Sequence, residues 1–187
     1  DYAEQYYQHV KAFPRYISAT HSICEDIEKR RILLENLQDE ENKDGDHPKL
    51  WKNFAKALGA DEKEIEKVKL DWFTKDMIDN FFSQARKSYA EGLASLYTYE
   101  RQIPEIAETK IQGLKKFYGV SSNEGLEFFE AHKSADVIHR AECEKLLDSL
   151  SKEEQEKAER ASLLTARYLW NFLSGMTSKH KLENIAA

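Results

Sequence analysis

Two histidines and an aspartate stand close together in the segment HKSADVIH, as His132, Asp136 and His139. An α-helix turns by about 100° per residue, so Asp136 would lie about 40° and His139 about −20° from His132 around the helix axis. The three side chains would share one narrow face, and imidazole with carboxylate suits iron, manganese or zinc. The Asp136-x-x-His139 spacing is also one that helical bundles use for metals. The alternative is an ordinary solvated face, because Lys133 and Arg140 lie on the same helix.

A second group of candidate ligands flanks a break in the helical pattern. The segment DEENKDGDHPKLW places Glu40 at the end of one expected helix and His47 at the start of the next. The intervening turn can bring both side chains to a single ion. The alternative is a solvated acidic loop, and we expect that role for the neighbouring Asp39, Glu41 and Asp44.

Glu100 is the third candidate, because its segment LYTYERQIPEIAE mixes apolar and aromatic residues that indicate partial burial. A buried carboxylate is unfavourable unless a cation compensates its charge. That cation is either a metal ion or a basic side chain such as Arg101. If the cation is a metal ion, the three carboxylates and three histidines together suit two adjacent divalent ions. Glu40 and His47 would hold one ion, the HKSADVIH residues mainly the other, and Glu100 would bridge them. Carboxylate-rich iron pairs in helix bundles activate dioxygen.

The elements that must position these residues all show the period of an α-helix, and no segment alternates convincingly like a β-strand. We expect a single all-α bundle of roughly seven helices, without repeats or a domain boundary. The expected helices cover about 2–12, 14–41, 46–59, 61–64, 74–102 with a continuation to 119 after a bend at Pro104, 121–150 and 151–176. From Ser178 onward we expect a frayed tail.

Five residues mark the expected helix ends most clearly. Pro14 suits a helix start, because the first turn leaves its N–H groups unbonded. Asp46 and Thr74 are expected to cap the helices that follow them. Pro104 cannot bond the carbonyl one turn earlier and should bend its helix, whereas Gly119 should end it.

The composition limits the functions that the chain can have. Its 187 residues, 41% of them apolar, fit one domain with a sufficient core. The net charge of −6, without a basic block, argues against nucleic-acid binding. No stretch approaches the ~18 apolar residues of a membrane span. Cys24 and Cys143 are too few for a disulfide framework, so a cytoplasmic location is expected. The chain opens as if in mid-helix, without an initiator methionine, and we expect a further N-terminal helical segment in the full-length protein.

A family resemblance rests on the ligand spacing and on longer segments. The sequence resembles the haem-oxygenase-like di-metal oxidases at all six candidate ligands, Glu40, His47, Glu100, His132, Asp136 and His139. The segments QYYQHVKAFPRYISATHS, LLENLQDEEN, LYTYERQIPEIAETKIQGLKKFYG and ADVIHRAE further resemble the branch of that family named for its association with death domains. The resemblance covers nearly the whole chain. It implies a seven-helix haem-oxygenase-like fold, two metal ions (Fe/Fe or Fe/Mn), dioxygen as co-substrate and a homodimer.

The same resemblance implies a role in making p-aminobenzoate for folate biosynthesis. Members of that branch use one of their own tyrosines for the aromatic ring and a lysine for the amino group. Lys110 matches that lysine, and Tyr2 and Tyr99 match other family tyrosines near the site, whereas the consumed tyrosine would lie before residue 1. Without the resemblance, we would interpret Lys110 as a surface lysine of a helix that also carries Lys115 and Lys116.

Other functions stay open at this point. A di-metal enzyme can instead oxidise a small external amino or fatty acid. The related pyrroloquinoline quinone synthase works without metal, and thiaminase-II relatives use a cysteine, but the clustered ligands and the lack of a base beside either cysteine disfavour both. A protein of another class would be a binding module for a death-domain partner. No nucleic-acid or membrane partner is expected.

The remaining histidines and early tyrosines are expected to pack rather than react. Tyr6, Tyr7 and Tyr16 should bury their rings with hydrogen-bonded hydroxyls. His9 and His21 lack carboxylate partners at helical spacing and should be structural.

Overall fold

The structure is a computed structural model that describes residues 1–43 and 45–182, apart from the side chains of residues 134 and 135. The described chain is helical and contains no strand, which confirms the predicted all-α fold. Its elements are α1 (Tyr2–Ile23), α2 (Ile27–Glu40), α3 (His47–Ala57), α4 (Glu62–Ile65), α5 (Trp72–Lys87), α6 (Tyr89–Glu100), α7 (Ile103–Gly113), the π-helix η1 (Leu114–Tyr118), α8 (Asn123–Asp148) and α9 (Lys152–Lys179). The expectations for Asp44 and for the tail at 183–187 lie outside the described residues.

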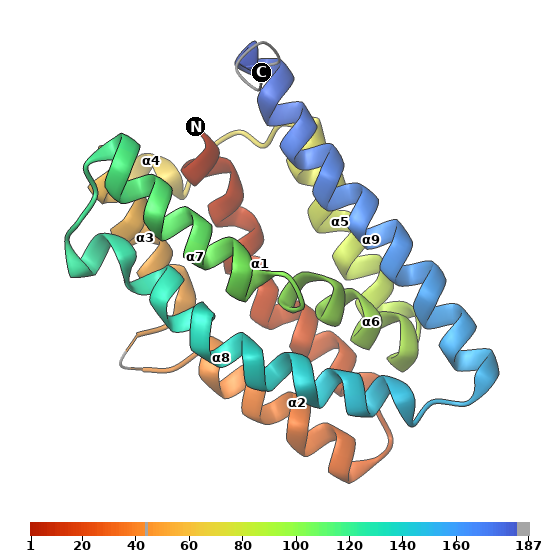
Figure 1. Ribbon diagram of the computed structural model, residues 1–187. Helices are drawn as coiled ribbons and strands as arrows, with labels where there is room; N and C mark the ends of the chain where they lie inside the picture. The colour runs from red at the N-terminus through yellow and green to blue at the C-terminus, as the bar shows by residue number, and fades with distance from the viewer. Residues whose placement is uncertain (44, 183–187) are drawn as a thin grey trace.

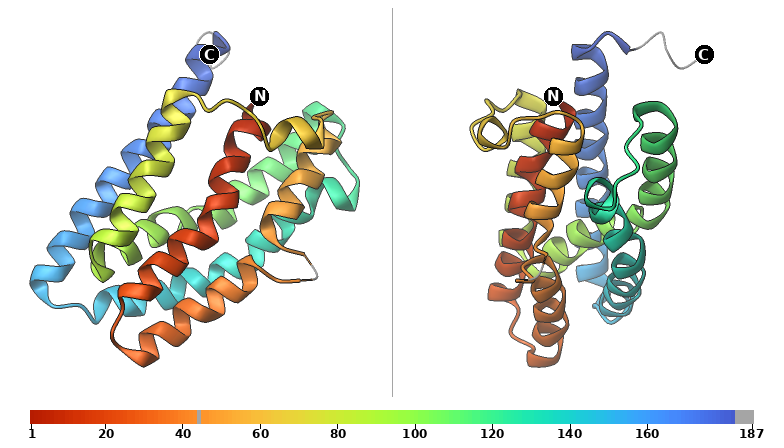
Figure 2. Two further views of the ribbon diagram at one scale, coloured as in Figure 1. Left: turned by 180° about the vertical axis from the view of Figure 1, so that it is seen from behind. Right: turned by 90° about the vertical axis from the view of Figure 1, so that its left-hand side faces the viewer.

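Helix α1 runs through the middle of the bundle and packs against α2, α3, α5 and α6 (Figure 1). On one side α9 packs along α5 and α6, and on the other α8 packs against α3 and α7 (Figure 2). The end of α9 returns to the start of α1, where Lys179 Nζ lies 2.9 Å from Asp1 Oδ2. No helix in the described part of the chain combines the length and the apolar character that crossing a membrane requires.

Several predicted helix ends are confirmed. Asp46 caps α3 by accepting a hydrogen bond from the backbone N–H of Lys49 at 2.8 Å. Gly119 follows η1 with a left-handed φ of 68°, a conformation that glycine adopts without strain. Ser151 and Glu154 form a reciprocal capping box at the start of α9. These caps fix where the ligand-bearing helices begin and end.

The predicted start of a helix at Pro14 is wrong, because α1 continues through Pro14 to Ile23. A proline inside a helix removes one backbone hydrogen bond, because it has no N–H group. Here the flanking Tyr16 and Ile17 are fully buried and hold the helix against the core. The chain breaks instead before Asp26, whose side chain caps α2.

Thr74 does not cap a helix, and the single long helix expected from it is two helices. Thr74 is buried inside α5, where its hydroxyl donates to Gln5 Oε1 at 2.7 Å. The break falls at Ser88, whose backbone is extended and whose hydroxyl accepts from the N–H of Glu91. Ser88 therefore starts a separate helix, α6, that ends in the predicted ligand Glu100.

A glycine sets how closely α6 approaches α1. A Cβ at Gly92 would lie 2.5 Å from Thr20 Oγ1 and 2.9 Å from Thr20 Cγ2, with Ala85 Cα at 3.2 Å. A larger residue would therefore push α6 away from α1 and α5. Glu100 lies at the end of the same helix, so this close packing also helps to position its backbone.

Candidate metal centre

The structure buries all six predicted ligands at the meeting point of α2, α3, α6 and α8. Each exposes at most 5% of its surface: Glu40, His47, Glu100, His132, Asp136 and His139. On the outer face of α8, Val137 and Ile138 are 46% and 62% exposed. Asp136 therefore points inward, as expected of a metal ligand, and the alternative of a solvated face is wrong. Three carboxylates buried together are strongly unfavourable unless cations compensate them.

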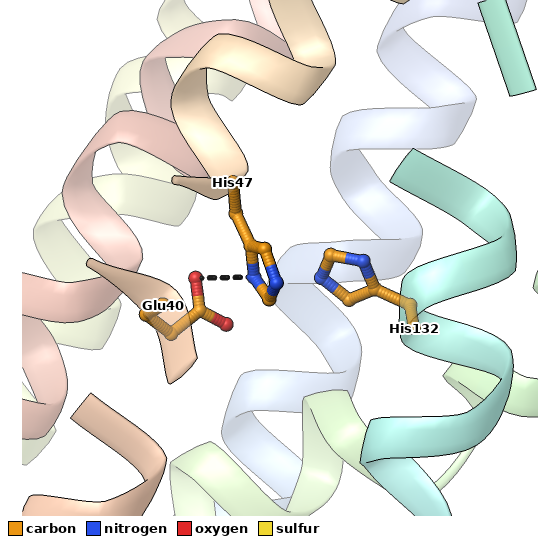
Figure 3. A group of neighbouring side chains, drawn as sticks. All are labelled: Glu40, His47 and His132. Carbon is orange, nitrogen blue, oxygen red and sulfur yellow. Dashed lines mark ion pairs between the residues drawn. The ribbon is translucent and has the colours of Figure 1, made fainter. Parts of the chain in front are cut away.

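Glu40, His47 and His132 form a compact group of donors (Figure 3). Within the described residues, one ligand atom from each lies within 4.8 Å of the others. His47 Nδ1 is 2.8 Å from Glu40 Oε2, and the rings of His47 and His132 are 4.2 Å apart between centroids. The three side chains come from the end of α2, the start of α3 and the middle of α8, and they point toward one another (Figure 3).

The contact between His47 and Glu40 has the distance of an ion pair without the alignment of a hydrogen bond. Burial works against a charge on His47, but the Glu40 carboxylate outweighs it and raises the pKa of His47 above its ordinary value. The imidazole and the carboxylate thus face a shared space. A cation there would satisfy both groups better than they satisfy each other.

The ring of His132 is oriented by the backbone of its own helix. His132 Nδ1 lies 2.7 Å from the carbonyl oxygen of Phe128. Since a carbonyl only accepts, Nδ1 carries the proton and Nε2 keeps its lone pair. Burial, followed by the charge of His47, lowers the pKa of His132. His132 is therefore a neutral imidazole with one nitrogen available to a metal.

Asp136, His139 and Glu100 lie beside this group and influence one another strongly. His139 Nδ1 is 3.8 Å from Asp136 Oδ1. Burial and then the charge of Asp136 raise the pKa of Glu100 to about 8. Burial opposes protonation of His139, but its contacts with Asp136 and the charge of Glu100 raise its pKa to about 9. Asp136 Oδ2 is buried with no hydrogen-bond partner in the described structure. Carboxylates that repel each other around an unpartnered oxygen fit a second cation.

The grouping of the ligands in the structure differs from the expected division between two ions at one residue. His132 was expected mainly with Asp136 and His139, whereas the structure groups it with Glu40 and His47. The reason is that α3 packs against α8 and brings His47 directly beside His132.

Two contacts that sequence reasoning missed hold Glu100. Asn36 Nδ2 donates to Glu100 Oε1 at 2.6 Å, and the Cys143 thiol donates to Oε2 at 3.6 Å. Each partner lies four residues from a predicted ligand, Asn36 before Glu40 and Cys143 after His139. That spacing places them on the ligand faces of α2 and α8 and is the signal that could have found them.

Asp39 is not the simple solvated residue that its loop context predicts. Its side chain is 56% exposed, but its Oδ2 lies 3.0 Å from Nε2 of the buried His139. Because α2 is still helical at this point, Asp39 reaches the outer edge of the site while Glu40 points into it. Glu41 is exposed, as expected.

A largely apolar cavity of about 290 Å³ adjoins the metal ligands. Its lining includes Tyr2, Tyr6, Trp51, Tyr99, Lys110 and His132. Lys110 Nζ lies 3.0 Å from the hydroxyl of Tyr2 and 4.2 Å from the centre of its ring. The structure thus brings the predicted residues Tyr2, Tyr99 and Lys110 to one cavity beside His132.

The tyrosines of this cavity are linked to one another. Tyr2 stacks on Tyr6 with 5.5 Å between ring centroids, and Tyr6 and Tyr99 are close enough to shift each other's pKa. Burial, followed by the neighbouring Tyr6, raises the pKa of Tyr99 well above its ordinary value. Since Tyr99 precedes Glu100, a series of phenol side chains extends from the metal ligands to Lys110.

The expectations for the remaining tyrosines and histidines are met in part. Tyr7 donates to Glu66 Oε1 at 2.7 Å, as a packing tyrosine should. The buried hydroxyl of Tyr16 lacks a partner in the described structure, so its predicted hydrogen bond is wrong. His9 is surrounded by aromatic rings, and burial lowers its pKa to about 3. His9 is therefore a neutral packing residue.

A helical bundle that buries histidines and carboxylates together has the donor set of a metal-binding protein. A family model described as "Iron-containing redox enzyme" matches residues 1–170. The chain belongs to this family, so it is an oxidoreductase with a metal cofactor.

Comparisons with individual proteins agree with that assignment. The chain is 43% identical over 173 residues to 4-aminobenzoate synthase of Chlamydia trachomatis, covering 92% of this chain and 75% of that protein. It is 38% identical over 189 residues to 4-aminobenzoate synthase of Nitrosomonas europaea, covering 94% of this chain and 76% of that protein. The predicted family resemblance is confirmed.

Solved structures support the fold. A TenA homolog from Pseudomonas syringae pv. tomato matches with a TM-score of 0.80 at 16% identity, covering 92% of this chain and 76% of that one. A domain with a heme oxygenase-like fold from Shewanella denitrificans matches with a TM-score of 0.71 at 17% identity, covering 94% of this chain and 77% of that one.

Proposed function

We propose that this chain is a dioxygen-dependent, two-metal oxidase that forms 4-aminobenzoate. The observation that carries the proposal is the burial of all six ligands around Glu100, next to a cavity that Lys110 lines. The two relatives described above, both named 4-aminobenzoate synthase, supply the product.

The donor set fits two ions, either Fe/Fe or Fe/Mn. Glu40, His47 and His132 would hold one, Asp136 and His139 would hold the other, and Glu100 would lie between them. When bound, such a metal pair supplies electrons to dioxygen and oxidising power to a nearby aromatic ring. The protein contributes the dry surroundings and the fixed orientation of the donors.

The aromatic ring would come from a tyrosine of the protein, and Lys110 would supply the amino group. Lys110 lies over the ring of Tyr2, and Tyr2 connects through Tyr6 to Tyr99 beside Glu100. This arrangement holds an amine and oxidisable phenols in one apolar cavity. The Tyr2 hydroxyl and ring face the Lys110 ammonium group and keep it at the cavity wall.

The test is a single exposure of iron-loaded protein to dioxygen. The protein, expressed from its complete gene, would be purified without oxygen, loaded with iron alone or with iron and manganese, exposed to air, and assayed for 4-aminobenzoate by mass spectrometry. We expect the product only with metal and dioxygen, together with a changed intact mass of the protein. Full metal occupancy without product would contradict the proposal.

Two substitutions separate the lysine from the metal site. Lys110→Met should abolish product formation while metal content stays unchanged, because Lys110 touches none of the six ligands. Lys115→Met is the matched control on the exposed surface and should behave like the original chain. Product formation by Lys110→Met would contradict the role of Lys110 as amine donor.

The second candidate function is oxidation of a small external molecule, which the cavity of about 290 Å³ favours because it has room for one. It predicts repeated turnover on an added small amino or fatty acid with no change in the mass of the protein. The intact-mass measurement therefore distinguishes the two functions.

Three further predictions concern the setting of the enzyme. We propose a homodimer, supported by the exposed apolar side chains of Leu163, Trp170 and Leu173 on α9, and light scattering would measure it. A cytoplasmic location and a death-domain partner stay predictions. Cell fractionation and a binding assay with a purified death domain would test them.

A further inference from the structure

Asp39 stands outside the metal centre but touches it through one ligand. The six ligands expose at most 5% of their surfaces, whereas the Asp39 side chain is 56% exposed. Its Oδ2 lies 3.0 Å from Nε2 of His139. Asp39 is thus the outer neighbour of a ligand, and it comes from α2 whereas His139 comes from α8.

The two ring nitrogens of His139 face different groups. Asp39, as an exposed carboxylate, only accepts hydrogen bonds, so Nε2 must carry a proton and donate it. Nδ1 faces inward, 3.8 Å from Asp136 Oδ1. Two donors bound to one ion at about 2.1 Å each can be no more than about 4.2 Å apart. The separation between Nδ1 and Asp136 therefore fits two ligands of the same metal.

We propose that Asp39 is a positioning residue, which keeps the Nε2 proton of His139 toward the surface and turns Nδ1 toward the metal. The inference rests on the proposed metal centre. A carboxylate behind a ligating histidine fixes the ring orientation, selects the tautomer and makes the other nitrogen a better donor. Asp39 and Glu40 are consecutive, so one turn of α2 provides both a ligand and the support for a ligand on α8.

The position of Asp39 distinguishes it from an ordinary surface ion pair. Exposed pairs contribute little to stability and tolerate substitution. Here one partner, His139, is only 5% exposed, so its ring cannot turn to solvent when the acceptor is removed. Glu35 lies one turn earlier on α2, is exposed, and has no side-chain hydrogen bond or ion pair in the described structure, so Glu35→Gln is a matched control.

The experiment compares Asp39→Asn, Asp39→Ala, Asp39→Glu and Glu35→Gln with the original chain. Binding of ferrous iron without oxygen, and of zinc, would be measured by calorimetry and elemental analysis. We expect Asp39→Ala to weaken the second ion by about 10–100-fold while the first ion is retained. Asp39→Asn should lose at least as much, because its amide can donate to Nε2 and hold the opposite tautomer. Asp39→Glu should partly restore binding.

Nitrogen-15 NMR of the zinc-loaded chain provides a readout independent of activity. It should show His139 bound through Nδ1 with Nε2 protonated. Binding of zinc through Nε2, or unchanged binding of both ions in Asp39→Ala and Asp39→Asn, would overturn the inference. Equal loss in Glu35→Gln would overturn it too. Failure of the original chain to bind any metal would instead contradict the proposed function.

Discussion

The imidazole rings of His47 and His132 lie 4.2 Å apart between centroids, although they belong to α3 and α8. His132 keeps its Nε2 lone pair free because Nδ1 donates to the Phe128 carbonyl. Together with Glu40 they form a donor group that is assembled by the packing of three helices. The protein therefore holds this part of the site in place by its fold.

Substitution of His132 tests that donor group. His132→Ala should reduce bound iron to at most one ion per chain, because it removes a ligand that no neighbouring side chain replaces. The fold should persist, with a helical circular-dichroism spectrum close to that of the original chain. His21→Ala, on a partly exposed position far along α1, should retain its iron. Full iron content in His132→Ala would contradict the assignment.

Asn36 should affect iron binding without being a ligand. Asn36→Ala removes the donor that holds Glu100 Oε1 at 2.6 Å, and we expect about 10–100-fold weaker iron binding. The loss of a buried hydrogen bond should also lower the free energy of unfolding by about 1–3 kcal/mol. Calorimetric iron titration and urea unfolding would measure the two effects. Unchanged affinity would show that Glu100 does not depend on Asn36.

Gly92 should be sensitive to a single added methyl group. Gly92→Ala places a Cβ within 2.5 Å of Thr20 Oγ1 and should reduce the free energy of unfolding by about 1–3 kcal/mol. In a Thr20→Ala background the penalty should shrink, because the two closest atoms are gone and alanine favours a helix over glycine by about 1 kcal/mol. Urea unfolding of the four proteins gives the coupling energy. Additive effects would contradict the close packing of α6 on α1.

Glu66 should make the fold less stable in acid. It contacts Lys11 at 2.6 Å and Lys52 at 2.5 Å, and these hydrogen bonds lower its pKa from 4.5 to about 2. A lowered pKa means that the stabilisation is complete above about pH 4.5 and is lost as the pH falls toward 2. Its size should be about 1 kcal/mol, since the group is partly exposed.

The matched pair for this prediction is Glu66→Gln and Glu64→Gln. Thermal melts at several pH values should show that Glu66→Gln is less stable at neutral pH and loses less stability on acidification. Glu64→Gln, an exposed neighbour on α4, should follow the original chain. The same acid dependence in all three proteins would rule out the Glu66 network as its cause.

The helical period predicted that three candidate ligands share one face of α8, whereas the expectation that this face points inward depended on the other candidate ligands and on the family resemblance. It places His132, Asp136 and His139 together whatever packs against them, and their burial agrees. Glu40 and His47 were recognisable because they flank a break between helices. Asn36, Cys143 and Asp39 were not, because their roles depend on contacts between α2, α6 and α8 that local spacing does not specify.

Helix boundaries failed where packing and capping competed with local preference. Pro14 is tolerated inside α1 because its neighbours are buried, and Thr74 hydrogen-bonds Gln5 instead of capping. Ser88 divides an otherwise continuous helical pattern by capping α6. These outcomes are set by tertiary contacts, which outweigh the few tenths to about 1 kcal/mol of local propensity.

Anomalous diffraction at the iron edge from a crystal of the iron-loaded chain tests the central claim most directly. The account predicts two peaks on either side of Glu100. One should lie among Glu40, His47 and His132, and the other beside Asp136 and His139. A single peak elsewhere, or no peak among these six side chains despite bound iron, would contradict it.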